Sequence, residues 1–282
     1  MSRLGSGWMV VAALCFALMS LFAAQGSATL PAFEVLFYRT FIGLLALLPL
    51  MWRRGESLRS PHWGAHARRS LIGYLSMVML FYALSRLPLA AAVTLNYTSS
   101  LSFALCCVLL RRERLPPAVW LALSLGFVGI ACMLRPTFDA GQWFAGLMGL
   151  GSGLGAGLAL FHVRELGELG ELGERPSVTV FWLFFLSSLF GLLVVLFNGG
   201  FHALNGVQLA QMLAVGLMGL AGQLAMTRAY KEGRKFVVSS LAYLTVAFSA
   251  LMGLFLHQQL LPMLSWLGMA LIIGSGILAA RR

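Results

Sequence analysis

The stretch that decides the fold runs from Tyr82 to Cys132 and reads YALSRLPLAAAVTLNYTSSLSFALCCVLLRRERLPPAVWLALSLGFVGIAC. It holds an apolar segment, a short charged turn, two prolines and a second apolar segment. A shift of 146 positions, without a gap, places this stretch on residues 228–278. The shift aligns identical residues at Leu95/Leu241, Tyr97/Tyr243, Pro116/Pro262 and Trp120/Trp266. Such matches at one constant offset predict an internal duplication, with units 1–138 and 139–282.

The composition excludes a soluble domain. Hydrophobic residues make up 60% of the chain and charged residues 10%, and the mean hydropathy is +0.87, whereas a water-exposed surface needs far more charge. The apolar runs are nearly continuous and lack the alternation of a membrane β-barrel, so the prediction is an all-α integral membrane protein. At roughly 20 residues per span, ten transmembrane helices are expected. Their approximate ranges are 6–24, 31–51, 70–87, 89–110, 117–134, 143–163, 177–197, 207–229, 236–256 and 263–280.

The first apolar run has two interpretations. Arg3 before the run, and Ala23-Ala24 near its end, also fit a cleaved signal peptide. We favour a retained first helix, because the run is long and belongs to the repeat. The four cysteines lie inside apolar runs and have no disulfide or metal-ligand spacing, so they are interpreted as packing residues. They are Cys15, Cys106, Cys107 and Cys132.

The basic residues are distributed unevenly over the predicted loops. The formal net charge is +11, which by itself would also fit a nucleic-acid partner. However, seventeen of the twenty Lys and Arg residues fall at the termini or in the loops after helices 2, 4, 6 and 8. Arg86 and Arg135 fall on the other side, and Arg39 falls within helix 2. This positive-inside pattern predicts cytoplasmic termini and makes a nucleic-acid partner unnecessary.

Duplication and topology together predict an inverted repeat. A unit of five helices is odd, so the second copy must cross the membrane in the opposite direction. The charged turn at Arg111–Arg114 corresponds to the uncharged residues 257–260, as expected if the two turns lie on opposite sides.

Two local features stand apart. Residues 164–175 repeat Glu-Leu-Gly three times, which we interpret as a low-complexity expansion, with a partner site as the alternative. The helix at 143–163 carries six glycines, for which close packing is favoured over a pliant, rocking helix. These are Gly146, Gly149, Gly151, Gly153, Gly155 and Gly157.

Several of these motifs resemble a known family. Residues 112–116, followed by Trp120, Gly126 and Gly129, resemble the repeat signature of the EamA-type drug/metabolite transporters. Residues 37–39 are similar to the aromatic-plus-arginine position of that family, and 159–166 resemble its repeat-opening helix. In the second copy, Gln259 occupies the position that corresponds to Glu113 in the first. A functional role for an acidic residue at this position is therefore unsupported in the second copy.

The resemblance implies a basket of ten helices around a central cavity, formed mostly by helices 1 to 4 and 6 to 9. Among the family, the ten-helix amino-acid and metabolite exporters of bacterial inner membranes are nearest. The small multidrug branch uses a glutamate in helix 1, which is absent here, so proton-coupled cation export is disfavoured.

Polar residues inside membrane helices are the candidates for a solute site, because their burial needs a reason. The expected substrate-binding residues are Tyr38, Tyr82, Asn96, Tyr97, His162, Trp182, Gln223 and Tyr243. For each tyrosine and tryptophan, an interfacial anchor or a packing role is the alternative. Arg39 needs a partner in the membrane, and Glu34 is the expected structural partner, with a substrate carboxylate as the alternative.

This inventory predicts a transporter that needs no cofactor or metal. Catalytic motifs are absent from the sequence, which argues against an enzyme. Aromatic and amide groups with scarcely any charge in the membrane favour a small, nearly neutral solute, and an amino acid with an apolar or aromatic side chain fits. We expect facilitated exchange, with His162 or Glu34 as proton carriers if there are any. The alternatives are a multidrug or nucleotide-sugar type carrier, a channel-like facilitator, and a membrane enzyme. The partners expected are the solute and the lipid bilayer; the sequence does not fix the oligomeric state, and a monomer is compatible with it.

Overall fold

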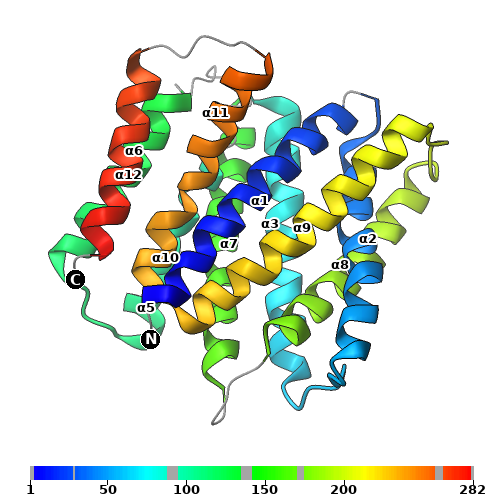
Figure 1. The fold of residues 1–282 in the computed structure, drawn as a ribbon, viewed down its shortest axis with the longest axis horizontal. Coiled ribbons are helices and arrows are strands. Elements are labelled where there is room, and N and C mark those ends of the chain that lie inside the picture. The colour runs from blue at the N-terminus through cyan, green and yellow to red at the C-terminus, as the bar shows by residue number, and fades with distance from the viewer. Residues whose placement is uncertain are drawn as a thin grey trace.

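The computed structural model describes residues 3–27, 29–87, 95–134, 142–169, 175–257 and 263–280, and its regular elements in these ranges are helices. Figure 1 shows them as one bundle. The helices are α1 (Arg3–Ser27), α2 (Ala32–Arg53), α3 (Trp63–Arg86), α5 (Ser99–Arg111), α6 (Pro117–Leu134), α7 (Trp143–Glu168), α8 (Pro176–Phe197), α9 (Gly206–Glu232), α10 (Lys235–Ala242), α11 (Leu244–His257) and α12 (Met263–Ala280).

The expectation of a multi-pass helical membrane protein is confirmed. Within the described ranges, five helices are long and apolar enough to cross a bilayer. They lie at Gly5–Ala23, Ala32–Arg53, Trp143–Glu168, Pro176–Phe197 and Gly206–Glu232. Shorter apolar helices include Ser99–Arg111 and Pro117–Cys132.

The third helix begins earlier than the sequence predicted. The expected range was 70–87, with Arg68 and Arg69 in the preceding loop, but α3 starts at Trp63. Both arginines are therefore helical, and Arg69 is only 4% exposed. The predicted start was placed where the apolar run begins. A helix can begin before its apolar residues, because its backbone hydrogen bonds do not depend on side-chain polarity. As a result, the interior holds one more guanidinium than the sequence had indicated.

Two of the predicted helices are interrupted, and at related positions. The expected helix 236–256 is divided into α10 and α11 at Tyr243. Leu95 and Asn96 are helical, Tyr97 and Thr98 form a turn, and α5 begins at Ser99. Residues 89–94, the first part of the predicted helix 89–110, lie outside the described ranges. Both interruptions thus fall on the tyrosines that the 146-residue shift aligns.

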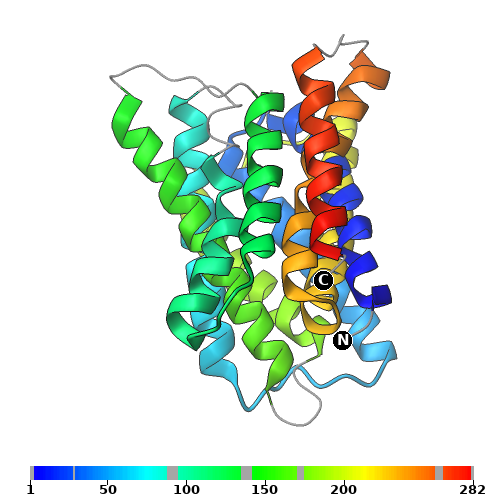
Figure 2. The ribbon, with the colours of Figure 1, turned by 90° about the vertical axis from the view of Figure 1, so that its left-hand side faces the viewer.

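Packing joins helices that are distant in the sequence. α1 packs against α9, α3 against α7, and α6 against α12, while α2 contacts both α8 and α9. α5 lies against α7, and α10 and α11 lie against α1. Figures 1 and 2 show α6 and α12 together at one side of the bundle. The core is therefore spread over several interfaces instead of lying in one central layer.

The glycines of α7 allow a close approach to its neighbours. A Cβ on Gly153 would lie 2.5 Å from the Leu95 carbonyl oxygen, and one on Gly157 would lie 2.5 Å from the Ser102 Cβ. On another face, a Cβ on Gly155 would lie 3.1 Å from the Ser76 Cβ of α3. These contacts support the close-packing interpretation of the glycines.

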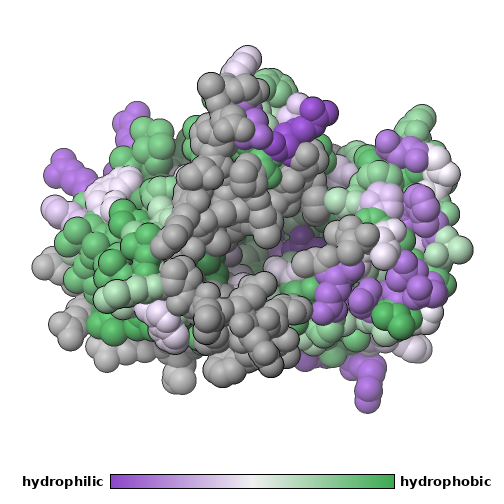
Figure 3. All heavy atoms as spheres, turned by 90° about the horizontal axis from the view of Figure 1, so that it is seen from above, coloured by the Kyte–Doolittle hydropathy of each residue, from purple (hydrophilic) through white to green (hydrophobic). Residues whose placement is uncertain are grey.

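The two ends of the bundle differ in charge. Both chain termini lie at the same end (Figure 1), and the ends of α2, α5, α7 and α9 that carry Arg53, Arg111, Arg164 and Lys231 lie there too. We call this the basic end. The opposite end holds the turn 198–205, whose Gly199 and Gly200 have positive φ angles of 102° and 88°. Seen from above in Figure 3, this opposite end has its hydrophilic residues mainly on one side, with apolar residues on the other.

Candidate transport site

The predicted site residues do not form one cluster. Trp182 and Gln223 lie near two arginines among α2, α3, α8 and α9. Asn96, Tyr97 and Tyr243 lie at the helix interruptions, and His162 lies at the basic end. Tyr38 and Tyr82 lie toward the opposite end.

The paired tyrosines belong to a packed region. The rings of Tyr97 and Tyr243 lie 6.3 Å apart, centre to centre, in an edge-on arrangement. Tyr243 is 0% exposed and packs with Ile130 of α6 and Ile272 of α12. Its hydroxyl donates to the Leu123 carbonyl at 3.4 Å. These contacts give the tyrosines a role in joining the interrupted helices to α6 and α12.

Asn96 forms a hydrogen bond that links the interrupted segment before α5 to α7. Its Nδ2 donates to the Ser152 hydroxyl of α7 at 3.1 Å, and that hydroxyl donates to the Gly149 carbonyl at 2.6 Å. Ser76 of α3 donates to the Ser152 carbonyl at 2.7 Å. The chain of hydrogen bonds ties α3, α7 and the segment before α5 together.

A second group, which we call the arginine cluster, consists of Arg39, Arg69, Trp182 and Gln223. Arg39 Nη1 approaches Met77 of α3 at 3.5 Å, and Met77 lies one turn beyond Gly73, which an Arg69 terminal nitrogen approaches on the same helix. A Cβ on Gly219 of α9 would lie 3.5 Å from the Arg39 Nε, and Gln223 follows Gly219 by four residues on the same helix face. A Cβ on Gly73 would lie 3.6 Å from an Arg69 terminal nitrogen. Trp182 of α8 stacks on His66, which lies three residues before Arg69 on α3. Four helices therefore contribute to this cluster.

The cluster is rich in hydrogen-bond donors that have no acceptor. The Nε atoms of Arg39 and Arg69, Nε1 of Trp182 and Nε2 of Gln223 are buried without a hydrogen-bond partner among the described residues. The Nη1 atom of Arg39 donates to the Met77 sulfur at 3.5 Å, which is a weak acceptor. Buried donors are normally paired, so this group calls for an explanation.

The expected pairing of Arg39 with Glu34 is wrong. Glu34 bonds His202 of the α8–α9 turn through both the backbone N–H, at 3.3 Å, and the imidazole Nδ1. Five residues along a helix correspond to roughly 500° of rotation, which points the two side chains to different faces. Glu34 therefore fixes the start of α2 to the turn and leaves Arg39 without its predicted partner.

The basic end carries a set of ion pairs that join the two predicted units. Each pair has one residue from 1–138 and one from 139–282. They are Arg68–Glu165 at 3.6 Å, Arg175–Glu56 at 3.8 Å, Arg111–Glu168 and Lys235–Glu113. Among the described residues, Glu34–His202 is the corresponding pair at the opposite end. Among the described residues, ion pairs between the units are thus concentrated at the basic end.

His162 belongs to this end. Its Nδ1 lies 2.8 Å from the Glu165 carboxylate, which also faces Arg68. His66, which the predicted ranges leave in a loop, is also helical, and its ring stacks on Trp182 with the ring centres 6.1 Å apart. The earlier start of α3 explains why His66 was overlooked.

The remaining two tyrosines pack near the opposite end. Tyr38 lies against Phe37 and Phe201, with ring centres 5.6 and 6.0 Å apart. Tyr82 is 38% exposed, lies edge-on to Phe144 and has Arg86 5.8 Å from its ring centre. These surroundings suit aromatic packing near an interface.

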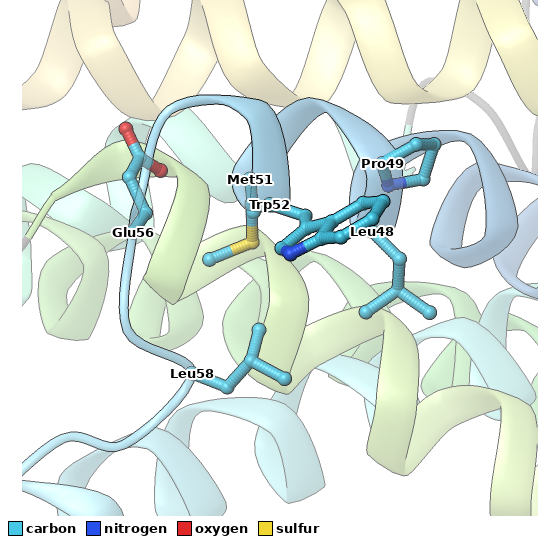
Figure 4. A pocket seen from close by; sticks show the side chains of 6 residues that line it. All are labelled: Leu48, Pro49, Met51, Trp52, Glu56 and Leu58. Atoms are coloured by element: carbon cyan, nitrogen blue, oxygen red, sulfur yellow. The ribbon is translucent and has the colours of Figure 1, made fainter.

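A pocket of about 420 Å³ lies at the end of α2, away from these groups. Figure 4 shows its lining, which includes Trp52 and Glu56. Since Trp52 is largely exposed and none of the predicted site residues lines this pocket, we do not assign the transported solute to it. Within the described ranges no group of three His, Cys, Asp or Glu side chains is arranged to hold a metal ion.

Comparisons with known proteins agree with this architecture. Residues 3–135 match the EamA-like transporter family. The chain is 28% identical to the pseudopaline exporter CntI of Pseudomonas aeruginosa, over 96% of this chain and 94% of that protein. It is also 28% identical to a riboflavin transporter of Rhizobium johnstonii, over 98% of this chain and 91% of that one. A solved crystal structure matches the fold with a TM-score of 0.83 and 21% identity, covering 99% of this chain and 98% of the other.

Proposed function

We propose that this chain, whose residues 3–135 match the EamA-like transporter family, is a transporter that exports small metabolites, amino acids foremost, by alternating access. Its relatives are transporters of small molecules, and this likeness supports the function of a membrane transporter for this chain. The solute class, the direction and the inner-membrane location are the proposal.

Helix positions support an inverted repeat of units 1–138 and 139–282. Adding 146 to the bounds of α5 gives 245–257, and α11 is Leu244–His257. Adding 146 to the bounds of α6 gives 263–280, and α12 is Met263–Ala280. α6 begins at the basic end, whereas α12 ends there (Figure 2), as an inverted copy requires.

The packing pattern supports the same symmetry. If α1, α2 and α3 correspond to α7, α8 and α9, the contact of α1 with α9 corresponds to that of α7 with α3. The contact of α2 with α9 corresponds to that of α8 with α3, and α2–α8 and α6–α12 correspond to themselves. Helices interrupted near the middle of such repeats are typical of secondary transporters.

The single observation that carries alternating access is the concentration of unit-to-unit ion pairs at the basic end. Four such pairs join the units at that end, with side chains that are mostly partly exposed, and ion pairs in contact with water contribute about 0–1 kcal/mol each. Four pairs together favour the closed end. Each pair is weak enough to break when the units move. We interpret the structure as the state closed at the basic end, with rocking of the units opening it.

The basic end is proposed to be cytoplasmic, with both chain termini. Arg53, Arg54, Arg59, Arg111 and Lys231 lie there, whereas Arg86 is the described arginine of the opposite end. This distribution follows the positive-inside rule.

The side chain of the proposed amino-acid solute is left open. An apolar or aromatic side chain was expected because the sequence indicated scarcely any charge in the interior. Arg39 and the newly buried Arg69 remove that assumption, so the proposal keeps the class and leaves the side chain open. A multidrug or nucleotide-sugar carrier, and a channel-like facilitator, are the alternatives.

Counterflow in proteoliposomes tests the proposal. Vesicles preloaded with an unlabelled amino acid are expected to accumulate the labelled one transiently and saturably, while protein-free vesicles are not. Accumulation of only a nucleotide sugar or a cationic dye would favour the alternative carriers. A flux that rises linearly with concentration, without counterflow, would favour a channel.

A further inference from the structure

The arginine cluster holds positive charge that the described part of the protein does not neutralise. Each of the six described carboxylates already has another partner, which is an Arg or Lys side chain in five cases and the His202 imidazole for Glu34. The pairs are Glu34–His202, Glu56–Arg175, Glu113–Lys235, Glu165–Arg68, Glu168–Arg111 and Glu232–Arg228. Asp139, Glu171 and Glu174 lie outside the described ranges. No described carboxylate is therefore paired with Arg39 or with Arg69.

This arrangement is costly unless an anion joins it. A guanidinium at the centre of a membrane helix costs about 2.5–3.5 kcal/mol on insertion scales. A second one nearby adds like-charge repulsion. Charged groups inside a membrane protein commonly pair or mark a solute path.

The geometry indicates what would pair with them. Guanidinium groups present forked N–H donors that match a carboxylate with two parallel hydrogen bonds. The arginines come from different helices, α2 and α3, so they suit two separate anionic groups better than one. Trp182 Nε1 and Gln223 Nε2 supply further unpaired donors from α8 and α9.

We infer that the arginine cluster binds a small organic acid with two anionic groups, such as a dicarboxylate, between α2, α3, α8 and α9. The inference rests on the proposed transport function and names the chemistry of its solute. Arg39 and Arg69 bind one anionic group each, and Trp182 and Gln223 donate to the remaining oxygens. An amino acid that carries a second carboxylate fits this description.

A charge series tests the inference on the unaltered protein. Succinate, its monoamide and its diamide have nearly the same size and carry two, one and no negative charges. Isothermal titration of the detergent-purified chain should show affinity falling about tenfold or more with each lost charge, since hydrogen bonds to charged groups are the strong ones. The same comparison for glutarate and adipate allows for the spacing between the arginines. If no dicarboxylate binds more tightly than its diamide, the inference is wrong.

Variants locate the site. Arg39→Gln and Arg69→Gln should each weaken succinate binding about tenfold or more, whereas Arg53→Gln, an exposed arginine of α2, should leave it unchanged. Equal binding by all three would place the anion elsewhere. Should the glutamine variants fail to fold, Arg39→Lys and Arg69→Lys keep the charge and should still lose affinity, because lysine lacks the fork.

Two further measurements distinguish a failure of this inference from a failure of the proposed transport function. Methyl phosphate carries its charge on one group, and binding as tight as that of succinate would overturn the assignment of two separate anionic groups. Counterflow of neutral amino acids that is indifferent to Arg39→Gln and Arg69→Gln would leave the proposed function standing and refute the inference. Dicarboxylate binding without counterflow of any solute would do the reverse.

Discussion

Tyr97 and Tyr243 are separated by 146 residues, and their rings meet edge-on at 6.3 Å where two helices are interrupted. Each tyrosine lies at the same place in its copy of the repeat. The contact joins the two predicted units in a packed region with α6 and α12. A disturbance of this region should therefore affect stability more than solute binding.

The close fit of Gly126 against Tyr243 gives the first prediction. A Cβ at position 126 would lie 2.3 Å from the Tyr243 ring, whereas one at Gly274 of α12 meets nothing within 4 Å. Gly126→Ala should destabilise the protein by about 1–3 kcal/mol, and Gly274→Ala should not. Thermal unfolding in detergent measures the difference. Equal unfolding temperatures for the two variants would contradict the described packing.

The Lys235–Glu113 pair gives a prediction about closure of the basic end. Lys235→Glu places two negative charges together and should favour opening. Cys107, which is 2% exposed and one turn before Arg111, reports on this opening through its rate of alkylation. With the other three cysteines replaced, the rate should rise about two- to fivefold, as expected for an exposed pair.

The reversed pair provides the control for closure. Lys235→Glu combined with Glu113→Lys should return the alkylation rate of Cys107 toward its original value. Arg53→Glu changes an exposed arginine of α2 and should leave the rate unchanged. If the double variant is as reactive as the single one, the ion pair does not control opening.

Arg164 gives a prediction about the end of α9. Its guanidinium is largely buried and donates to the carbonyls of Tyr230, Lys231 and Gly233, at 3.2 Å for Lys231 and 3.3 Å for Gly233. Arg164→Gln should cost about 1.5–3 kcal/mol per charged hydrogen bond lost. Arg228→Gln, which removes a more exposed pair, should cost about 0.2–1 kcal/mol. Thermal unfolding that ranks the two in the opposite order would be inconsistent with this role.

The orientation in the membrane is testable by labelling. In a cysteine-free background, Ala203→Cys at the opposite end should react with a membrane-impermeant maleimide added to intact cells. Ser57→Cys, at the basic end, should react only after the membrane is opened. Labelling of both positions, or of Ser57→Cys alone, in intact cells would reverse or refute the proposed orientation.

Much of the fold could be predicted from the sequence, because long apolar runs and prolines at helix starts carry strong local signals. The constant offset from Tyr97 to Tyr243 even identified the positions where helices are interrupted. It did not reveal the interruptions themselves, since the residues around Tyr243 are as apolar as a continuous helix requires.

The candidate site was harder to predict. Trp182 and Gln223 were recognised as polar groups in apolar helices, and both lie in the arginine cluster. Arg69 was missed because a run of Ala, Arg and Ser residues resembles a loop, while its side chain turns inward from α3. The partner of Glu34 was missed for another reason, since His202 is distant in the sequence and only the folded chain brings the two together.

The unneutralised charge of Arg39 and Arg69 has a consequence for turnover. A carrier that has released an acidic cargo must return across the membrane with both guanidinium groups bare, whereas a loaded carrier returns with them neutralised. The loaded path should then be the faster one, so that acid supplied on the far side accelerates release from the near side. Such trans-stimulation would make the protein an exchanger, whose net export depends on what the receiving side offers in return.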